Sequence, residues 1–350
     1  MPPFYTLSGN DVDILLVVDN SGSMGEAQHS FVTNLPSLIN ALRHPDFGPD
    51  GSGKACDAAH RAGCRLPNMH LGVISTDLGA GNYALPSCEQ PSGDGGRLLN
   101  KARIAGCQPP ADRYVAYIEG LTNIPGGAKD SAQAFIDSAA CISRLGIDGC
   151  GFEHPFEAMY RALQPNANPG FLREHASLLV IFLGDEDDCS ASRQDLFDPA
   201  QQSPDSPLGP LTSFRCFEHG FQCDQSGRQP GVRTNCKPTG EWLYGVDRYV
   251  DLLRGLKRAP QDVIVGAIAG PSDKIEVALD GEKPRLRAAC SSAAGSALPA
   301  IRTHALVSAF APHSHFASIC EADYGPALER IGALVSARLA QQRAQGPTRP

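Results

Sequence analysis

The feature that most constrains this chain is an apolar run that ends in a short polar turn. Residues 14–18 are Ile-Leu-Leu-Val-Val, and residues 19–23 are Asp-Asn-Ser-Gly-Ser, just before a helix-like segment. An uninterrupted run of large aliphatic residues is typical of a strand buried on both faces of a parallel sheet. Such sheets bind their ligands outside the carboxyl ends of the strands. The run therefore predicts an α/β fold with residues 19–23 at its ligand-binding edge.

The polar turn carries side-chain oxygens at alternate positions. Asp19, Ser21 and Ser23 are separated by Asn20 and Gly22, so an extended turn can aim one carboxylate and two hydroxyls at a common point. One anionic and two neutral oxygens suit a small hard cation such as Mg²⁺, which retains water or accepts a further ligand. The alternative is that Asn20 or Ser23 caps the following helix.

The pattern D-x-S-x-S between a hydrophobic strand and a helix resembles the metal-ion-dependent adhesion site of the von Willebrand factor A-type family, which includes the integrin I domains. The continuation Ser23-Met24-Gly25 is similar to many bacterial members. Over about residues 11–343, the resemblance implies a Rossmann-like fold, with a doubly wound, mostly parallel sheet flanked by helices. It also implies a bound divalent cation, Mg²⁺ with Mn²⁺ or Ca²⁺ as alternatives, whose coordination is completed by a carboxylate of a partner.

A second acidic segment follows another buried run. Residues 178–183 are all apolar and are followed by Gly-Asp-Glu-Asp-Asp at 184–188. Because neighbouring parallel strands end at one edge of a sheet, Asp19 and Asp185 can close a single cation site. The resemblance places the family's second metal-site aspartate at Asp185, although Gly184 stands where the family usually has Thr. The alternative is a solvated acidic loop.

The third loop of the family normally supplies a threonine just before a helix. The corresponding residues of this chain, 149–159, contain neither Thr nor Ser, and Glu153 takes the expected place. A glutamate there implies a stronger and less selective hold on the metal. It also implies less positive charge left over to attract an acidic ligand. The alternative is that Glu153 is a helix-start carboxylate favoured by the helix dipole.

Twelve cysteines without a C-x-x-C pair are spread over the chain. Most lie in segments rich in Gly, Pro, Ser and Asp, which predicts disulfides that close long loops in an oxidising compartment. The alternative is reduced cysteines in a cytosolic protein. The spacing argues against zinc ribbons and thioredoxin-like chemistry. The pairs that we expect are Cys56–Cys64, Cys88–Cys107, Cys141–Cys150 and Cys290–Cys320, with Cys189, Cys216, Cys223 and Cys236 paired among themselves.

Strand-like and helix-like segments alternate along the chain, which is typical of a doubly wound sheet. We expect a single domain of von Willebrand A type over residues 1–350, with insertions that lack enough pattern for cores of their own. The insertions cover 45–68, 77–112, 189–240 and 271–300. Pro36 predicts a kink or a break in the first helix. The expected strands are 13–18, 69–76, 113–118, 178–183 and 262–268, and the expected helices are 24–42, 129–145, 155–164, 243–257 and 323–343.

Composition limits the classes of partner and the compartment. The formal charge is −8 and no Lys/Arg-rich run is present, so we expect no nucleic-acid partner. No apolar stretch reaches transmembrane length. Residues 1–4, Met-Pro-Pro-Phe, show no leader pattern. We therefore expect that an export signal or a lipoprotein signal has been removed. A lipoprotein signal would anchor the protein to a membrane. The expected location is extracytoplasmic, at the cell surface or outer membrane or secreted.

The resemblance makes adhesion the expected function, and the cysteine-rich form is similar to exported bacterial members, including surface adhesins of gliding myxobacteria. The partner would be a protein or surface ligand with an exposed carboxylate. The alternative is a structural subunit of an envelope assembly, and a metal-dependent hydrolase ranks third. We do not expect an enzyme, because the G-x-S-x-G, G-x-G-x-x-G and P-loop motifs are missing and His313 and His315 form an isolated H-x-H.

Overall fold

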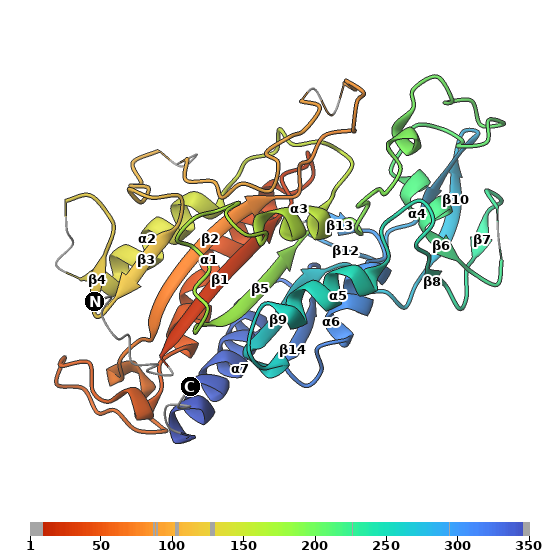
Figure 1. Cartoon of the computed structure of the whole chain (residues 1–350). Coiled ribbons are helices and arrows are strands. Elements are labelled where there is room, and N and C mark those ends of the chain that lie inside the picture. The colour runs from red at the N-terminus through yellow and green to blue at the C-terminus, as the bar shows by residue number, and fades with distance from the viewer. Residues whose placement is uncertain are drawn as a thin grey trace.

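The computed structural model describes residues 10–345 except 87, 89, 102–104, 127–129, 226 and 294. At its centre is a sheet of seven strands (Figure 1). These are β1 (Asp11–Val18), β2 (Asn68–Ser75), β3 (Val115–Ile118), β4 (Leu121–Thr122), β5 (Ser177–Leu183), β9 (Val263–Ala269) and β14 (Ser314–Ser318). Their order is β14-β9-β5-β1-β2-β3-β4, parallel from β14 to β2 and antiparallel at β3 and β4.

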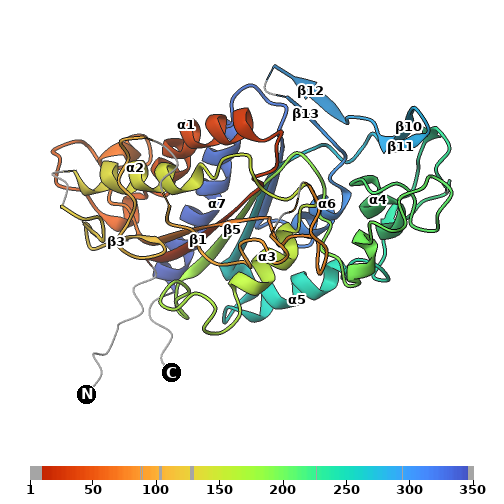
Figure 2. The same ribbon diagram turned by 90° about the horizontal axis from the view of Figure 1, so that it is seen from above.

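Helices cover both faces of the sheet. On one face lie α1 (Gly25–Ala41), α2 (Ser131–Ser143) and α7 (Gly325–Ala344), and on the other lie α3 (Pro155–Ala162), α5 (Val246–Gly255) and α6 (Ile301–Ser308). Figure 2 shows these two layers on either side of the strands. Side chains of β1 alternate between the layers, since Leu16 and Val18 join the first core and Leu15 and Val17 the second. The expected class, α/β with a mostly parallel sheet flanked by helices, is confirmed, and the arrangement is consistent with a Rossmann-like fold.

The order of the strands reverses between β1 and β5. From β1 the chain continues to β2 and β3 on one side of the sheet, while β5, β9 and β14 fill the other side. The last residues of the two strands, Val18 and Leu183, are direct partners. Ligands of open α/β sheets bind at such a switch point, outside the carboxyl ends of the strands. The fold therefore places residues 19–23 and 184–188 side by side at this position.

The five expected strands and five expected helices are all present, with ends shifted by a few residues. Residue 129, where α2 was expected to start, and the ends of the expected 1–350 domain lie outside the described residues. Of the kink or break predicted at Pro36, the break is wrong, because α1 continues through Pro36 with Leu35 and Leu38 buried on either side. Strand β14 was not predicted, since its sequence Ser-His-Phe-Ala-Ser is only partly buried at the edge of the sheet and lacks an apolar run.

The insertions contain short elements rather than loops alone. Residues 271–300, expected to be loop-rich, form four short strands in two hairpins. Two small hydrophobic clusters lie among these segments, one around Phe152 and Phe197 and the other around Phe217 and Val277. The elements are α4 (Phe214–Gly220), β6 (Phe221–Gln222), β7 (Gly231–Val232), β8 (Lys237–Pro238), β10 (Glu276–Asp280), β11 (Lys283–Leu286), β12 (Cys290–Ser292), β13 (Gly295–Ala297), and the 3₁₀ helices η1 (Pro45–Phe47), η2 (Arg61–Gly63), η3 (Gln194–Phe197) and η4 (Pro260–Asp262).

All twelve cysteines form disulfides. The pairs are Cys56–Cys64, Cys88–Cys150, Cys107–Cys141, Cys189–Cys216, Cys223–Cys236 and Cys290–Cys320. The expected pairs Cys88–Cys107 and Cys141–Cys150 are wrong. The two cysteines of the 77–112 insertion do not pair with each other, because Cys88 reaches the loop that contains Cys150 and Cys107 reaches α2, which contains Cys141. The remaining expectations are confirmed. Six disulfides favour an extracytoplasmic location. In the described part of the chain, no helix combines the length and apolar character needed to cross a membrane.

Candidate metal centre

Asp19 is the first residue after β1, and its side chain is almost completely buried. Its backbone N–H donates to the Leu183 carbonyl at 2.9 Å, which ties the end of β1 to the end of β5. Carboxylate oxygen Oδ1 accepts the Ser21 N–H at 2.8 Å. The other oxygen, Oδ2, is buried and has no hydrogen-bond partner among the described residues. One oxygen thus holds the turn together and the other is free for a ligand.

The two serine hydroxyls lie on the same turn as Asp19. Ser21 Oγ is 3.4 Å from Ser23 Oγ, and Ser23 lies beside the Asp185 carboxylate. Ser21 is buried, whereas Ser23 is exposed. The helix-capping alternative is wrong, because α1 begins after Met24 and no side chain caps it. The hydroxyls are therefore not committed to the helix start.

Asp185 follows β5 with Gly184 between them, and it is 8% exposed. Its Oδ1 is buried without a partner in the described structure. A Cβ at Gly184 would lie 3.3 Å from Asp19 Oδ2, so the glycine lets the two strand ends approach closely. Burial, and then the Asp185 carboxylate, raise the pKa of Asp19 to about 7. Burial also raises the pKa of Asp185, an effect that the Ser23 hydroxyl offsets in part.

Glu153 lies in the loop before α3 and is 3% exposed. Both of its carboxylate oxygens are buried and have no hydrogen-bond partner in the part of the chain that is described. Burial is the largest cause of the strong rise in its pKa, followed by the charges of Asp19 and Glu186. The backbone carbonyl accepts the Cys189 N–H at 2.8 Å. Glu153 is therefore fixed near the strand ends with both carboxyl oxygens unpartnered in the described structure.

The structure places Asp19, Ser21, Ser23 and Asp185 next to one another, with Glu153 close by. Within the described ranges, no group of three or more His, Cys, Asp or Glu side chains is arranged to hold a metal ion. Glu153 accordingly does not complete a three-carboxylate group with the two aspartates. A cation here would take two carboxylates, serine hydroxyls and water, a donor set that suits a hard divalent ion. The unpartnered buried oxygens fit such an ion.

Two polar residues of this edge were missed by sequence analysis. Gln28 of α1 is buried, and its amide donates to the carbonyls of Asp19 (2.7 Å) and Gly146 (2.9 Å), which joins two loops. Its signal is a polar residue within the apolar stripe of the helix. Thr76, just after β2, is also buried, and its hydroxyl has no partner among the described residues. Its signal is a hydroxyl residue directly after an apolar strand.

The acidic segment 184–188 is divided among different tasks. Asp188 forms a fully buried ion pair with Arg302, with Oδ2 3.0 Å from Nε. Asp187 accepts the backbone N–H groups of Arg302 (2.8 Å) and Thr303 (3.1 Å) at the start of α6. The alternative of a solvated acidic loop is wrong, because Asp185 and Asp188 are both buried. Asp187 and Asp188 thus hold the segment in place and leave Asp185 at the edge.

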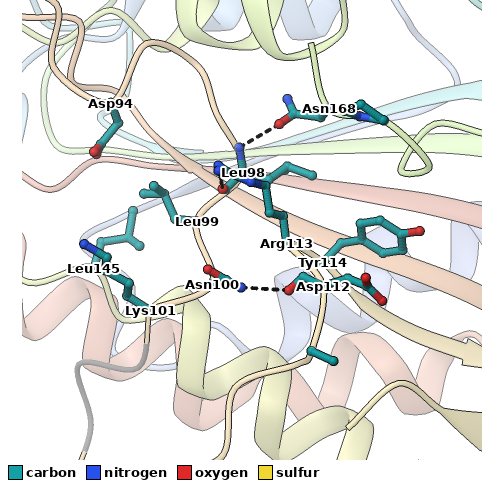
Figure 3. A pocket seen from close by; sticks show the side chains of 12 residues that line it. Asp94, Leu98, Leu99, Asn100, Lys101, Asp112, Arg113, Tyr114, Leu145 and Asn168 are labelled. Carbon is teal, nitrogen blue, oxygen red and sulfur yellow. Dashed lines mark hydrogen bonds between the residues drawn. The ribbon is translucent and has the colours of Figure 1, made fainter. Parts of the chain in front are cut away.

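A separate pocket of about 580 Å³ lies beside β2 and shares no lining residue with the expected ligand set (Figure 3). Its wall is held by internal hydrogen bonds, from the Leu98 N–H to Asn168 Oδ1 (3.0 Å) and from Asn100 Nδ2 to the Asp112 carbonyl (2.9 Å). These polar groups are engaged with the protein itself. The pocket therefore adds nothing to the candidate metal centre.

Comparisons with known proteins give little further information. No protein-family model and no curated protein matches this chain. Among solved structures, the chain is similar to the human COPII-coat protein Sec24c, with a TM-score of 0.32 and 11% sequence identity. The match covers 97% of this chain and 34% of that one, so this chain spans about a third of its length. A likeness at this level carries no conclusion about function.

Proposed function

We propose that this chain is a von Willebrand A-type protein that binds an acidic group of a partner through a divalent cation. The observation that carries the proposal is the pair of buried strand-end aspartates, Asp19 and Asp185, each with one oxygen that lacks a partner among the described residues. They lie at the switch point of the sheet, where such folds bind ligands. Ser21 and Ser23 would supply neutral oxygens. Mg²⁺ is the first choice of ion, with Mn²⁺ and Ca²⁺ as alternatives.

The proposal follows from the free energy of buried charge. Taking a carboxylate out of water without a partner costs several kcal/mol, about the size of the net stability of a domain. A bound divalent cation would offset that cost for both aspartates. The two aspartates balance the formal charge of the ion, so a partner's carboxylate would bind by replacing water in the part of the coordination shell that the neutral hydroxyls leave open. Gly22 and Ser23 are exposed, so this side of the centre is open to such a partner.

Titration calorimetry with Mg²⁺ and Mn²⁺ tests the cation site. Asp19→Asn and Asp185→Asn should weaken binding by more than the ~10–100-fold that loss of a supporting residue costs. Asp148→Asn is the matched control, because Asp148 is an exposed carboxylate of the neighbouring 146–151 loop. Circular dichroism checks that each variant remains folded. Unchanged affinity in folded Asp19→Asn would overturn the proposal.

Partner chemistry is tested with an array of peptides that contain Asp or Glu, each paired with its Asn or Gln counterpart. We expect binding of the acidic member only, in Mg²⁺, with loss of binding in EDTA and in Asp19→Asn. Binding that persists in excess chelator would count against metal-dependent adhesion. We propose a location at the cell surface or outer membrane or in secreted form, in line with the six disulfides.

A structural subunit of an envelope assembly is the second candidate. It is favoured by Glu153, since a third carboxylate close to the aspartates reduces the positive charge that a cation offers to an acidic partner. In that case removal of the metal would lower the melting temperature without changing any affinity for acidic peptides. Melting temperatures with and without EDTA, together with the peptide array, therefore separate the candidates.

A further inference from the structure

A small cavity lies next to the candidate metal centre, and Glu153 is among its lining residues. Its volume is about 30 Å³, and its polar lining includes Glu153, Glu186 and Ser213. Aromatic and aliphatic side chains, among them Phe152 and Phe217, form much of the remaining wall. This volume exceeds the ~10–15 Å³ that one water molecule needs, so the cavity has room for a hydrated ion or for water.

Two of the four acidic residues that line this cavity are already engaged. Asp188 accepts hydrogen bonds from Arg302 Nε (3.0 Å) and from the Phe156 N–H (3.1 Å). Asp187 accepts the two N–H groups at the start of α6. The carboxylates that remain belong to Glu153 and Glu186. Both carboxylate oxygens of Glu153 lack a partner in the described part of the chain. The Ser213 hydroxyl lies beside the Glu186 carboxylate.

The charges of this region do not balance with a single cation. Asp19 and Asp185 follow the ends of β1 and β5, and Glu153 and Glu186 line the neighbouring cavity. Among the described residues, no Lys, Arg or His forms an ion pair with any of the four. One divalent cation would neutralise half of the charge of four carboxylates, and two would neutralise all of it.

We propose that Glu153 and Glu186, with the Ser213 hydroxyl, hold a second divalent cation in this cavity. The inference rests on the proposed function, because it assigns Glu153 to a site beside the cation at Asp19 and Asp185. It agrees with the lack of a three-carboxylate group in the described structure, since each ion takes two carboxylates and completes its shell with hydroxyls and water. With both ions bound, a partner's carboxylate meets no excess of negative charge.

The test counts bound Mn²⁺ per folded chain by electron paramagnetic resonance of the free ion at equilibrium. We expect two ions for the unaltered protein, one for Glu186→Gln, one for Asp19→Asn and none for the double variant. Glu241→Gln, at an exposed glutamate just after the 189–240 insertion, should keep two. If Glu186→Gln fails to fold, Glu186→Asp replaces it, because the shorter side chain should weaken only the second ion.

The variants separate failure of this inference from failure of the proposed function. If the unaltered protein binds one ion, which Glu186→Gln keeps and Asp19→Asn loses, the second site is overturned and the first site stands. This result is also expected if a proton, rather than a metal ion, neutralises Glu186. If the unaltered protein binds one ion, which Glu186→Gln loses and Asp19→Asn keeps, the proposed cation site at Asp19 and Asp185 is overturned. No bound Mn²⁺ at all would overturn both.

Discussion

At the scale of single residues, the candidate metal centre depends on close approach between backbone segments. The Gly149 N–H donates to the Asn20 carbonyl at 2.8 Å. A Cβ at Gly149 would lie 2.4 Å from Asn20 Oδ1, whereas nothing lies within 4 Å of a Cβ at Gly22. A side chain at position 149 would therefore have to displace the Asn20 side chain from the metal-site turn.

Gly149→Ala should displace Asn20 and with it the turn that carries Asp19. Overpacking of this kind costs about 1–3 kcal/mol of unfolding free energy, and we expect weaker Mg²⁺ binding as well. Gly22→Ala is the matched control and should stay within about 0.5 kcal/mol of the unaltered protein. Urea unfolding and Mg²⁺ titration measure both effects. Equal behaviour of the two variants would contradict this explanation.

The pKa of Asp19 predicts how stability depends on pH. Burial and the Asp185 charge raise this pKa from 3.8 to about 7 in the metal-free folded protein. Between these values the folded state binds more protons than the unfolded state, so the contribution to unfolding free energy falls as pH rises from about 4 to 7. Mg²⁺ binds the deprotonated carboxylates, so the rise in melting temperature on adding Mg²⁺ should be larger at about pH 8 than at about pH 5.

Differential scanning calorimetry at both pH values, with and without Mg²⁺, measures this effect. Asp19→Asn serves as the control, because an amide does not titrate and the variant should lose most of the Mg²⁺-dependent increase. If Mg²⁺ raises the melting temperature by the same amount at both pH values, these carboxylates do not bind the ion.

At the scale of elements, the loop after β5 is held by α6 rather than by solvent. The Asp188–Arg302 pair is fully buried, and Arg302 also donates to the Tyr244 carbonyl at 2.6 Å. Three segments that are far apart in sequence thus meet at one guanidinium group. The orientation of Asp185 therefore depends on a contact three residues further along the chain.

Arg302→Met should leave the Asp188 carboxylate buried without its cation. Removal of one partner of a buried pair costs about 3–5 kcal/mol, and we expect Mg²⁺ binding to weaken as the loop shifts. Arg258→Met is the control, because Arg258 pairs with Glu174 on the surface and such a pair contributes about 0–1 kcal/mol. Urea unfolding compares the two, and a similar small loss in both would contradict the proposed role of Arg302.

At the scale of the whole molecule, the disulfides differ in whether they join separate segments or close a loop within one segment. Cys88–Cys150 joins the 77–112 insertion to the loop that carries Glu153, across 62 residues of sequence. Cys223–Cys236 closes a loop of 13 residues within the 189–240 insertion. The first disulfide thus fixes two loops next to the candidate metal centre, and the second acts locally.

Replacement of Cys88 and Cys150 by serine should lower the unfolding free energy by about 4 kcal/mol and should weaken Mg²⁺ binding. Replacement of Cys223 and Cys236 should cost about 3 kcal/mol or less, because the closed loop is shorter, and should leave Mg²⁺ binding unchanged. Calorimetric titration of both double variants measures the difference. Equal loss of metal affinity in the two would indicate a general effect of lower stability.

Sequence patterns predicted the parts of this fold that depend on local order. Uninterrupted apolar runs identified β1 and β5, and the polar residues after them identified Asp19 and Asp185 as neighbours at the carboxyl edge. Strand β14 was missed because an edge strand is only half buried and shows no such run. The pairings of Cys88 and Cys107 were wrong because nearness in sequence does not show which loops cross.

The sequence by itself determined a mostly parallel sheet with carboxylates and hydroxyls at the end of its central strands, since periodicity and turn residues act over a few positions. Tertiary structure alone decided how Gln28 joins two loops, which loops Cys88–Cys150 connects, and that Glu153 faces a cavity with Glu186. These features depend on contacts between segments that are far apart along the chain. Burial and unbalanced charge, which set the chemistry of this edge, arise only when those segments pack together.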